Sequence, residues 1–203
     1  MADVVNSLFI KQDGKFYDLY DLPDGFVIKG DLDLSGKGLT ELPDLSKVIV
    51  EGNFLCEHNQ LTSLEGAPQE VGGDFSCSYN QLTTLQGAPQ KVGGYFSCEN
   101  NQLTSLQGIS KEIGGKIEVD INISAQYGFN DGKIKLDDLK NSPLYREEIF
   151  ISEKSKELRS KVLRTVAAEN VSPEKGVTKP KRTAGEKNAI KQILDGIGKS
   201  IEK

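Results

Sequence analysis

Hydrophobic and polar residues recur along the middle of the chain with a period of 21 residues. Such a period decides the fold class, so it takes precedence over any single element. Each copy contains the tetrad Asn-Gln-Leu-Thr, which follows an apolar residue, two residues and a short strand-like run; the two residues are Gly-Gly before the second and third tetrads. The three tetrads are Asn59–Thr62, Asn80–Thr83 and Asn101–Thr104.

Each copy predicts one β-strand with an apolar and a polar face. Phe75 and Cys77 alternate with Asp74, Ser76 and Ser78, so the first pair should enter a core and the other three should meet water. Stacked copies continue such a sheet at about 4.8 Å per strand. Two weaker copies extend the stack to about four turns: Leu32 and Leu34 upstream, at an offset of 22, and Ile117 and Val119 downstream.

The residues around the strand predict how the chain turns. Asn80 follows the strand, so its side chain is expected to bond backbone groups that the turn leaves unpaired. Gly72 and Gly73 are expected to adopt positive φ on the return. Pro68 or Pro89 should stiffen the opposite, convex side.

The run Phe75-x-Cys77-x-x-Asn80-x-Leu82-x-x-Leu85 resembles the leucine-rich-repeat signature L-x-L-x-x-N-x-L-x-x-L. The resemblance covers residues 28–124, about half of the chain. A period of 21 is similar to the short repeats of bacterial and bacteriophage proteins, which have no room for a convex helix. The resemblance implies a mainly β solenoid that binds another macromolecule through its concave sheet.

The rest of the chain predicts two caps and a tail. Residues 1–27 predict an N-terminal β-hairpin cap with an Asp13-Gly14 turn, which seals the open end of the stack. Residues 125–170 predict a C-terminal cap and a helix starting at Ser142-Pro143. Residues 171–203 predict a basic linker and an amphipathic helix, so the appendage is helical. The apolar stripe of that last helix is Ile190, Ile193, Leu194, Ile197 and Ile201.

Charge is divided unevenly along the chain. The net charge is −5, but residues 1–139 hold 10 Lys/Arg against 21 Asp/Glu, while residues 140–203 hold 15 against 9. This asymmetry indicates separate partners for the two parts, or a tail that folds back on the acidic body. The first 15 residues do not resemble a signal peptide and no apolar run is long enough to span a membrane. We therefore expect a cytoplasmic protein, acting in the host cytoplasm if it is phage-borne.

Three features suggest chemistry, and each has a structural alternative. Cys56, Cys77 and Cys98 could form a thiolate metal site or a redox relay, but as an odd number spaced 21 apart they are better explained as small core residues. His58, the only histidine, has no repeating partner for catalysis and is expected at a binding rim or in solvent. Gly196–Ser200 echoes a phosphate-binding loop, yet Ile193 replaces the required glycine. We therefore expect no catalytic residues, no cofactor and no metal.

The polar side of the predicted sheet is the candidate binding surface. It is acidic, with two tyrosines expected near its middle, and repeat arrays bind through this face. The alternative is an ordinary solvated face. The expected partner-binding residues are Asp74, Tyr79, Tyr95, Glu99, Glu118 and Asp120.

These features favour a non-enzymatic protein-binding module whose partner presents a basic patch. From the resemblance, such a module is a bacterial or phage inhibitor or adaptor that engages a host protein. The alternative is a nucleic-acid-associated protein acting through the basic tail, although no aromatic residue follows Phe150 to stack on bases. Some leucine-rich-repeat effectors carry a cysteine ubiquitin-ligase domain, but residues 140–203 contain no cysteine. Sequence leaves the oligomeric state open.

Overall fold

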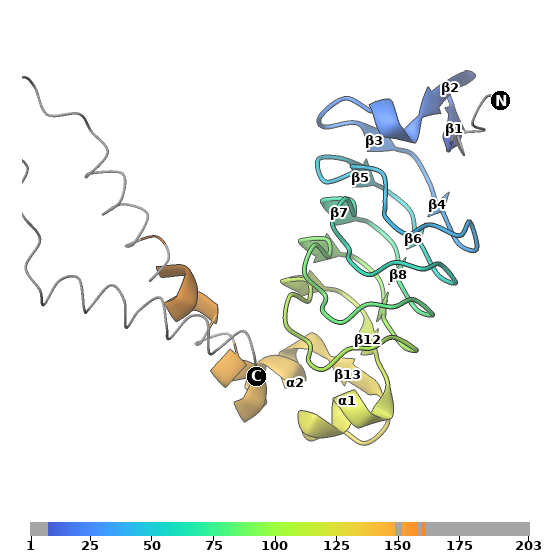
Figure 1. Cartoon of the computed structure of the whole chain (residues 1–203). Helices are drawn as coiled ribbons and strands as arrows, with labels where there is room; N and C mark the ends of the chain where they lie inside the picture. The colour runs from blue at the N-terminus through green and yellow to red at the C-terminus, as the bar shows by residue number, and fades with distance from the viewer. Residues whose placement is uncertain (1–7, 149–151, 158–159, 161–203) are drawn as a thin grey trace, which may run out of the picture. The chain divides into compact units, whose positions relative to one another are not determined.

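The computed structural model describes residues 8–148, 152–157 and 160. The chain divides into two units, residues 1–154 and 155–203. The first unit is a mainly β solenoid followed by a short helical region (Figure 1). In the second unit, residues 155–157 and 160 are helical.

Two parallel ladders of very short strands run along the solenoid. Strands of the first ladder are offset by 22, 21, 21 and 21 residues, from Leu32 through Phe54, Phe75 and Phe96 to Ile117. The sequence predicted this ladder and its register. Its strands are β4 (Leu32–Asp33), β6 (Phe54–Leu55), β8 (Phe75–Ser76), β10 (Phe96–Ser97) and β12 (Lys116–Glu118).

The second ladder forms a five-stranded sheet that the sequence did not predict. Its last three strands lie just before a Gly-Gly pair, and its first two lie before Lys29-Gly30 and Glu51-Gly52, so every turn of the solenoid contributes two strands. Val71 and Val92 pair across it and are buried. Its strands are β3 (Val27–Ile28), β5 (Ile49–Val50), β7 (Glu70–Val71), β9 (Lys91–Val92) and β11 (Glu112–Ile113).

Aromatic rings stack along the core. Phe54, Phe75 and Phe96 are fully buried, with ring centroids 5.7 Å and 5.0 Å apart. Because each ring packs on the rings of the neighbouring turns, the column joins the turns into one unit. The inward position of these residues confirms the predicted strand face.

The three cysteines form a second core column. Each is fully buried, and burial raises the pKa of each thiol well above its usual value. The Cys56 thiol donates to the Ser76 carbonyl oxygen at 3.3 Å, and the Cys77 thiol donates to the Ser97 carbonyl oxygen at 3.5 Å. The core interpretation of this column is therefore confirmed.

We expect Cys56, Cys77 and Cys98 to react slowly with a thiol reagent in native buffer. A thiol must reach solvent and lose its proton to react, and burial opposes both steps. Labelling should become fast for all three once denaturant unfolds the stack. Mass spectrometry of the labelled chain measures this directly, and rapid labelling of all three in native buffer would contradict the buried column.

An asparagine ladder closes each turn after the first strand. The Asn80 amide nitrogen donates to the carbonyl oxygens of Cys56, Cys77 and Ser78 at 2.9, 3.1 and 3.3 Å. Its side-chain oxygen accepts the backbone N–H of Leu61 at 3.0 Å. Asn59 and Asn101 make the equivalent bonds, so the predicted satisfaction of the turn by asparagine is confirmed.

The predicted positive φ at Gly72 and Gly73 is wrong. Neither residue has positive φ, whereas Gly87 of the Gly-Ala-Pro segment has φ 92°. A Cβ atom at Gly72 would collide with the carbonyl oxygen of Glu51 in the preceding turn, and one at Gly73 would collide with the side chain of Asn53. The glycine pair is therefore needed because neighbouring turns approach closely there, not because of its backbone conformation.

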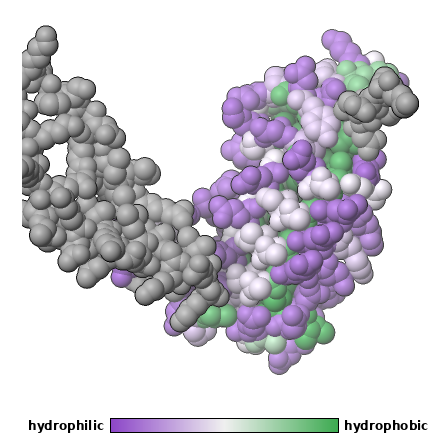
Figure 2. Space-filling view, viewed as in Figure 1, coloured by the Kyte–Doolittle hydropathy of each residue, from purple (hydrophilic) through white to green (hydrophobic). Residues whose placement is uncertain are grey.

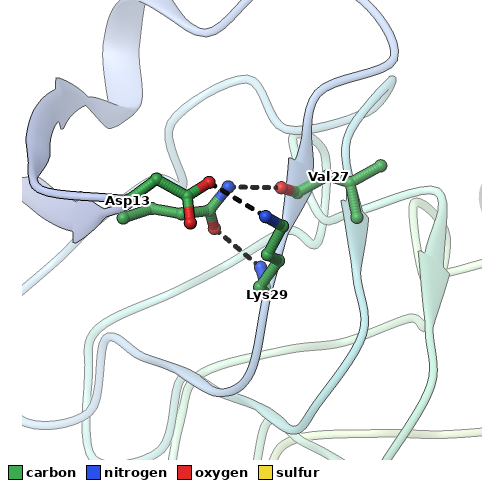
Figure 3. Close-up of polar contacts among 4 residues, drawn as sticks. Asp13, Val27 and Lys29 are labelled. Carbon is green, nitrogen blue, oxygen red and sulfur yellow. Dashed lines mark hydrogen bonds and ion pairs between the residues drawn. The ribbon is translucent and has the colours of Figure 1, made fainter.

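The hairpin β1 (Phe9–Gln12) and β2 (Lys15–Asp18) covers the N-terminal end, as predicted. Asp13 and Gly14 both have positive φ, which fits the two-residue turn. The Gln12 amide donates to the Val27 carbonyl oxygen at 3.0 Å and accepts the Lys29 N–H at 2.7 Å. Lys29 also pairs with Asp13 at 2.9 Å (Figure 3). The Gln12 side chain thus bonds backbone groups at the free edge of the second sheet, which a further strand would otherwise bond. The 3-10 helix η1 spans Leu19–Asp21.

The C-terminal end is closed by elements that the repeat pattern did not predict. Strand β13 (Lys133–Lys135) pairs antiparallel with β12 and makes the first sheet six-stranded. Helices α1 (Ile121–Gln126) and α2 (Leu136–Asn141) flank it, and residues 143–148 are helical. The predicted helix start at Ser142-Pro143 is confirmed. The predicted basic linker and final helix, residues 171–203, lie outside the described residues.

Candidate protein-binding surface

The outer face is the side of the six-stranded sheet that points away from the core. The residues that form it alternate with the buried Phe and Cys columns or continue the same positions on β13. They are Asp31, Asp33, Ser35, Asn53, Leu55, Glu57, Asp74, Ser76, Ser78, Tyr95, Ser97, Glu99, Lys116, Glu118, Asp120, Lys133 and Lys135. Tyr79 and His58 follow the strands at one edge.

Tyr79 is fixed by a left-handed turn and by its neighbour. Tyr79 and His58 have φ of 56° and 52°, a conformation that few bulky residues adopt. Their rings stack with centroids 4.3 Å apart and planes 15° apart. The Tyr79 side chain is nevertheless 49% exposed. His58 therefore lies at the rim, as predicted, and its ring also packs against the exposed ring of Tyr79.

Tyr95 is fixed at the opposite edge of the outer face. It precedes β10 directly, and its side chain is 50% exposed. A Cβ atom at Gly115 would overlap the Tyr95 ring, so this ring lies over the glycine of the next turn. In the ladder register Tyr95 aligns with Asp74, five residues before Tyr79. At 3.2–3.4 Å per residue, five residues of extended chain allow a separation of at most about 16–17 Å between the two tyrosines along the strand direction. They therefore lie at the edges of the face rather than near its middle.

Three of the four predicted carboxylates are engaged within the fold. Asp74 accepts the backbone N–H of Tyr95 at 2.7 Å, continuing a row in which Asn53 accepts the N–H of Asp74. Asp120 accepts the N–H of Asn100 at 3.0 Å, and Glu118 pairs with Lys133 at 3.3 Å. Asp74 and Asp120 therefore stabilise the stack, while Glu118 is partly neutralised.

Glu99 differs from the other three predicted carboxylates. Within residues 8–148 it makes no ion pair and no side-chain hydrogen bond. It is half-buried on the outer face, two residues after β10. Its charge is therefore not balanced by any ion pair within these residues.

Serine hydroxyls fill the middle of the outer face. Ser76 donates to the Glu57 carboxylate, and the hydroxyls of Ser78 and Ser97 lie 2.9 Å apart. Ser76 and Ser78 are buried, although the alternation predicted that both would meet water. Hydrogen bonds to neighbouring turns account for the difference, because a small hydroxyl between stacked strands is covered by the residues on either side.

The sequence interpretation missed the basic end of this face. Lys116 takes the position that Tyr95 occupies one turn earlier, and Lys135 pairs directly opposite it across β12 and β13. Lys133 joins them two residues away. The repeat register places Lys116 on this face, but no repeat extends to Lys133 or Lys135. The surface is therefore acidic over β4–β10 and basic at β13, rather than uniformly acidic.

Residues 8–148 show no cluster that suggests metal chemistry. In the described part of the chain, no three His, Cys, Asp or Glu residues are arranged to hold a metal ion. Within the same residues, no helix combines the length and the apolar character that a membrane crossing requires.

Comparisons of the chain with protein-family models, with characterised proteins and with solved structures gave no match. The repeat solenoid is therefore defined by its own geometry, and its function has to be argued from the surface.

Proposed function

We propose that this chain is a non-enzymatic protein-binding module of the short leucine-rich-repeat type, and that it binds its partner through the outer face. The observation that supports this most is the pair of half-exposed tyrosines held at opposite edges of one sheet. His58 supports Tyr79, and Gly115 lies beneath Tyr95. Rings that are already ordered lose little entropy on binding, and tyrosine is common at binding hot spots.

The partner that fits this face presents basic side chains. Glu57 and Glu99 lie between the two tyrosine edges, and Asp31 and Asp33 extend the acidic part toward the N-terminal end. The strip between the tyrosines is wide enough for one α-helix, which measures about 10–12 Å with its side chains. A helix with a basic face, lying along the stack, would contact both tyrosines and the carboxylates between them. The setting of an inhibitor or adaptor on a host protein comes from the resemblance alone.

We expect the tyrosines to control how long the partner stays bound. Tyr79→Asn and Tyr95→Asn should each speed dissociation by about 30-fold or more, since hot-spot aromatics contribute about 2 kcal/mol or more. The partner is first captured on the immobilised chain from an extract of the natural host and identified by mass spectrometry. Surface plasmon resonance then measures both rates.

Asparagine is the matched replacement at both positions. Asn100 already takes the place of Tyr79 in the next turn, with the same φ of 56°, and Asn53 takes the place of Tyr95 two turns earlier. The variants should therefore keep the melting temperature of the parent chain. Normal dissociation rates in both would show that the tyrosines are not the anchors.

Glu99→Lys should act on association instead. No residue within 8–148 neutralises this carboxylate, so reversing its charge should slow association at low salt, and the difference should shrink as salt rises. Glu99→Ser is the neutral control, since Ser78 fills this position one turn earlier. An association rate that is the same for the parent, Glu99→Ser and Glu99→Lys would contradict steering by this face.

A second candidate function is nucleic-acid binding by the basic run at the end of the chain. Its residues lie outside the described part, so its support is the sequence: Lys175, Lys179, Lys181, Arg182, Lys187 and Lys191. A chain ending at Lys175 separates the two functions. If it retains the captured partner, and if nucleic acid is retarded by neither chain, the outer face is the binding surface. If the outer-face variants bind normally and the shortened chain does not, the tail is.

A further inference from the structure

The N-terminal hairpin has an outer side that a cap would not need. Terminal elements of a solenoid keep the stack soluble by presenting a polar surface. Here Phe9 is 56% exposed and Phe16 is 71% exposed, and Tyr20 of η1 is also exposed. Figure 2 shows hydrophobic residues in green at this end of the solenoid. Sealing the stack does not require these aromatics on the solvent side, so their exposure indicates a contact surface.

The side on which each residue lies follows from the strand register. Gln12 bonds β3, Ile10 packs against the core, and Tyr17 packs on Phe26 at 4.9 Å, so these three face the solenoid. Phe9, Lys11, Phe16 and Asp18 then occupy the opposite side. Among them Phe9 lies directly opposite Asp18 on the neighbouring strand, and Lys11 lies directly opposite Phe16.

These four residues form a pattern that complements itself. The two phenylalanines lie on one diagonal of the hairpin, and the two opposite charges lie on the other. Two such hairpins can pack face to face around a two-fold axis along the Phe9–Phe16 diagonal. Each phenylalanine then meets its own copy, and Lys11 meets Asp18 of the second copy twice. A two-fold axis that lies in the plane of the hairpin but runs in another direction would place a phenylalanine against a charged side chain, or Lys11 against Lys11 of the second copy.

We infer that the outer side of the β1–β2 hairpin is a homodimer interface, with a second copy of this chain as its occupant. The two hairpins cross at a steep angle, close to the orthogonal class of sheet packing. The interface is isologous, because a two-fold axis brings the same patch of both copies together. Lys11, which lies 5.5 Å above the Phe16 ring within one chain, is already placed at the edge of this contact.

The size of the patch sets the strength of the dimer. A buried aromatic side chain contributes about 150–250 Å², so the exposed parts of Phe9 and Phe16 offer about 250 Å² per copy. Stable interfaces bury about 800 Å² per partner. The dimer is therefore weak, with a dissociation constant in the micromolar range or above, and it leaves the outer face of the six-stranded sheet free.

Sedimentation velocity of the full chain, from low micromolar to near-millimolar concentration, tests this interface. The sedimentation coefficient should rise with concentration, and Phe9→Ser and Phe16→Ser should each weaken association by about tenfold or more. Tyr79→Asn is the control, because it lies on the outer face and should leave association unchanged. A chain that stays monomeric throughout, or one whose association survives both phenylalanine variants, overturns the proposal.

A charge swap tests the two-fold arrangement. Lys11→Glu and Asp18→Lys each create two repulsive pairs in their own homodimer, so each alone should associate less than the parent. In an equimolar mixture, a mixed dimer pairs the introduced glutamate with the introduced lysine and keeps one Lys11–Asp18 pair, so association should return to the level of the parent. Asp18 also accepts the Tyr20 N–H, so circular dichroism must first show that Asp18→Lys is folded. If it is not, Asp18→Asn replaces it: its own dimer loses both ion pairs, and its mixture with Lys11→Glu, which keeps one Lys11–Asp18 pair, should associate more than either variant alone. A mixture no stronger than its components rules out this geometry.

Discussion

Replacing Phe75 with alanine is expected to destabilise the solenoid by about 3–5 kcal/mol. Phe75 is fully buried at the middle of the aromatic column, with its ring 5.7 Å from that of Phe54 and 5.0 Å from that of Phe96. Backbone hydrogen bonds hold the turns on both sides, so the structure cannot close around the missing ring. Thermal and urea unfolding measure the loss.

Phe16→Ala is the matched control for this measurement. It removes the same side chain from a position that is 71% exposed, so the expected change is within about 0.5 kcal/mol. Phe54→Ala and Phe96→Ala should resemble Phe75→Ala, and all three should melt the stack in one transition because it has so few turns. An unchanged midpoint for Phe75→Ala would contradict the ring column and the register that places it.

The sequence predicted the parts of the fold that repeat. Phe75, Cys77 and Asn80 recur at a fixed spacing, and each has one role that its chemistry makes clear: a large core residue, a small core residue and an amide that closes a turn. The hairpin was predicted for a similar reason, because Asp13-Gly14 between two apolar runs is a strong local signal for a two-residue turn.

The second sheet and the C-terminal cap could not be predicted in the same way. Glu70–Val71 is a strand of two residues, too short for an alternating pattern to be visible. Strand β13 appears once, without a repeat to reveal it, and it pairs antiparallel where every other strand of that sheet pairs parallel. The sequence pattern therefore did not place its two lysines at the candidate site.

The candidate site was predicted in composition rather than in arrangement. Alternation alone could identify Tyr95 and Glu99 as outward residues. It could not show that Asp74 and Asp120 bond the backbone of neighbouring turns, since those bonds depend on side-chain direction. The 21-residue register was predicted, but the sequence did not show where each strand ends. The structure places the left-handed turn at Tyr79, and this puts Tyr79 and Tyr95 at opposite edges of the face.

The glycine pair was interpreted incorrectly because two different needs select glycine. Positive φ and close approach of another backbone both exclude a side chain, and sequence does not distinguish them. The structure assigns close approach to Gly72, Gly93 and Gly114, since a Cβ atom at each would collide with a carbonyl oxygen in the preceding turn.

Gly93→Ala is therefore expected to destabilise the solenoid by about 3 kcal/mol, at the upper end of the usual cost of overpacking. The added methyl group points at the Gly72 carbonyl oxygen, and neither backbone can move away freely. The Gly93 N–H donates to the Val71 carbonyl oxygen at 2.8 Å, and the Gly72 N–H donates to the Val50 carbonyl oxygen at 2.8 Å. Relief of the collision must stretch these bonds between turns.

Gly128→Ala is the control, because Gly128 has φ of 92° but open space around it, so its cost is only the backbone strain of about 1–2 kcal/mol. Urea unfolding of the two variants separates close packing from backbone strain: if Gly93→Ala costs no more than Gly128→Ala, close packing of the turns does not account for the glycine column.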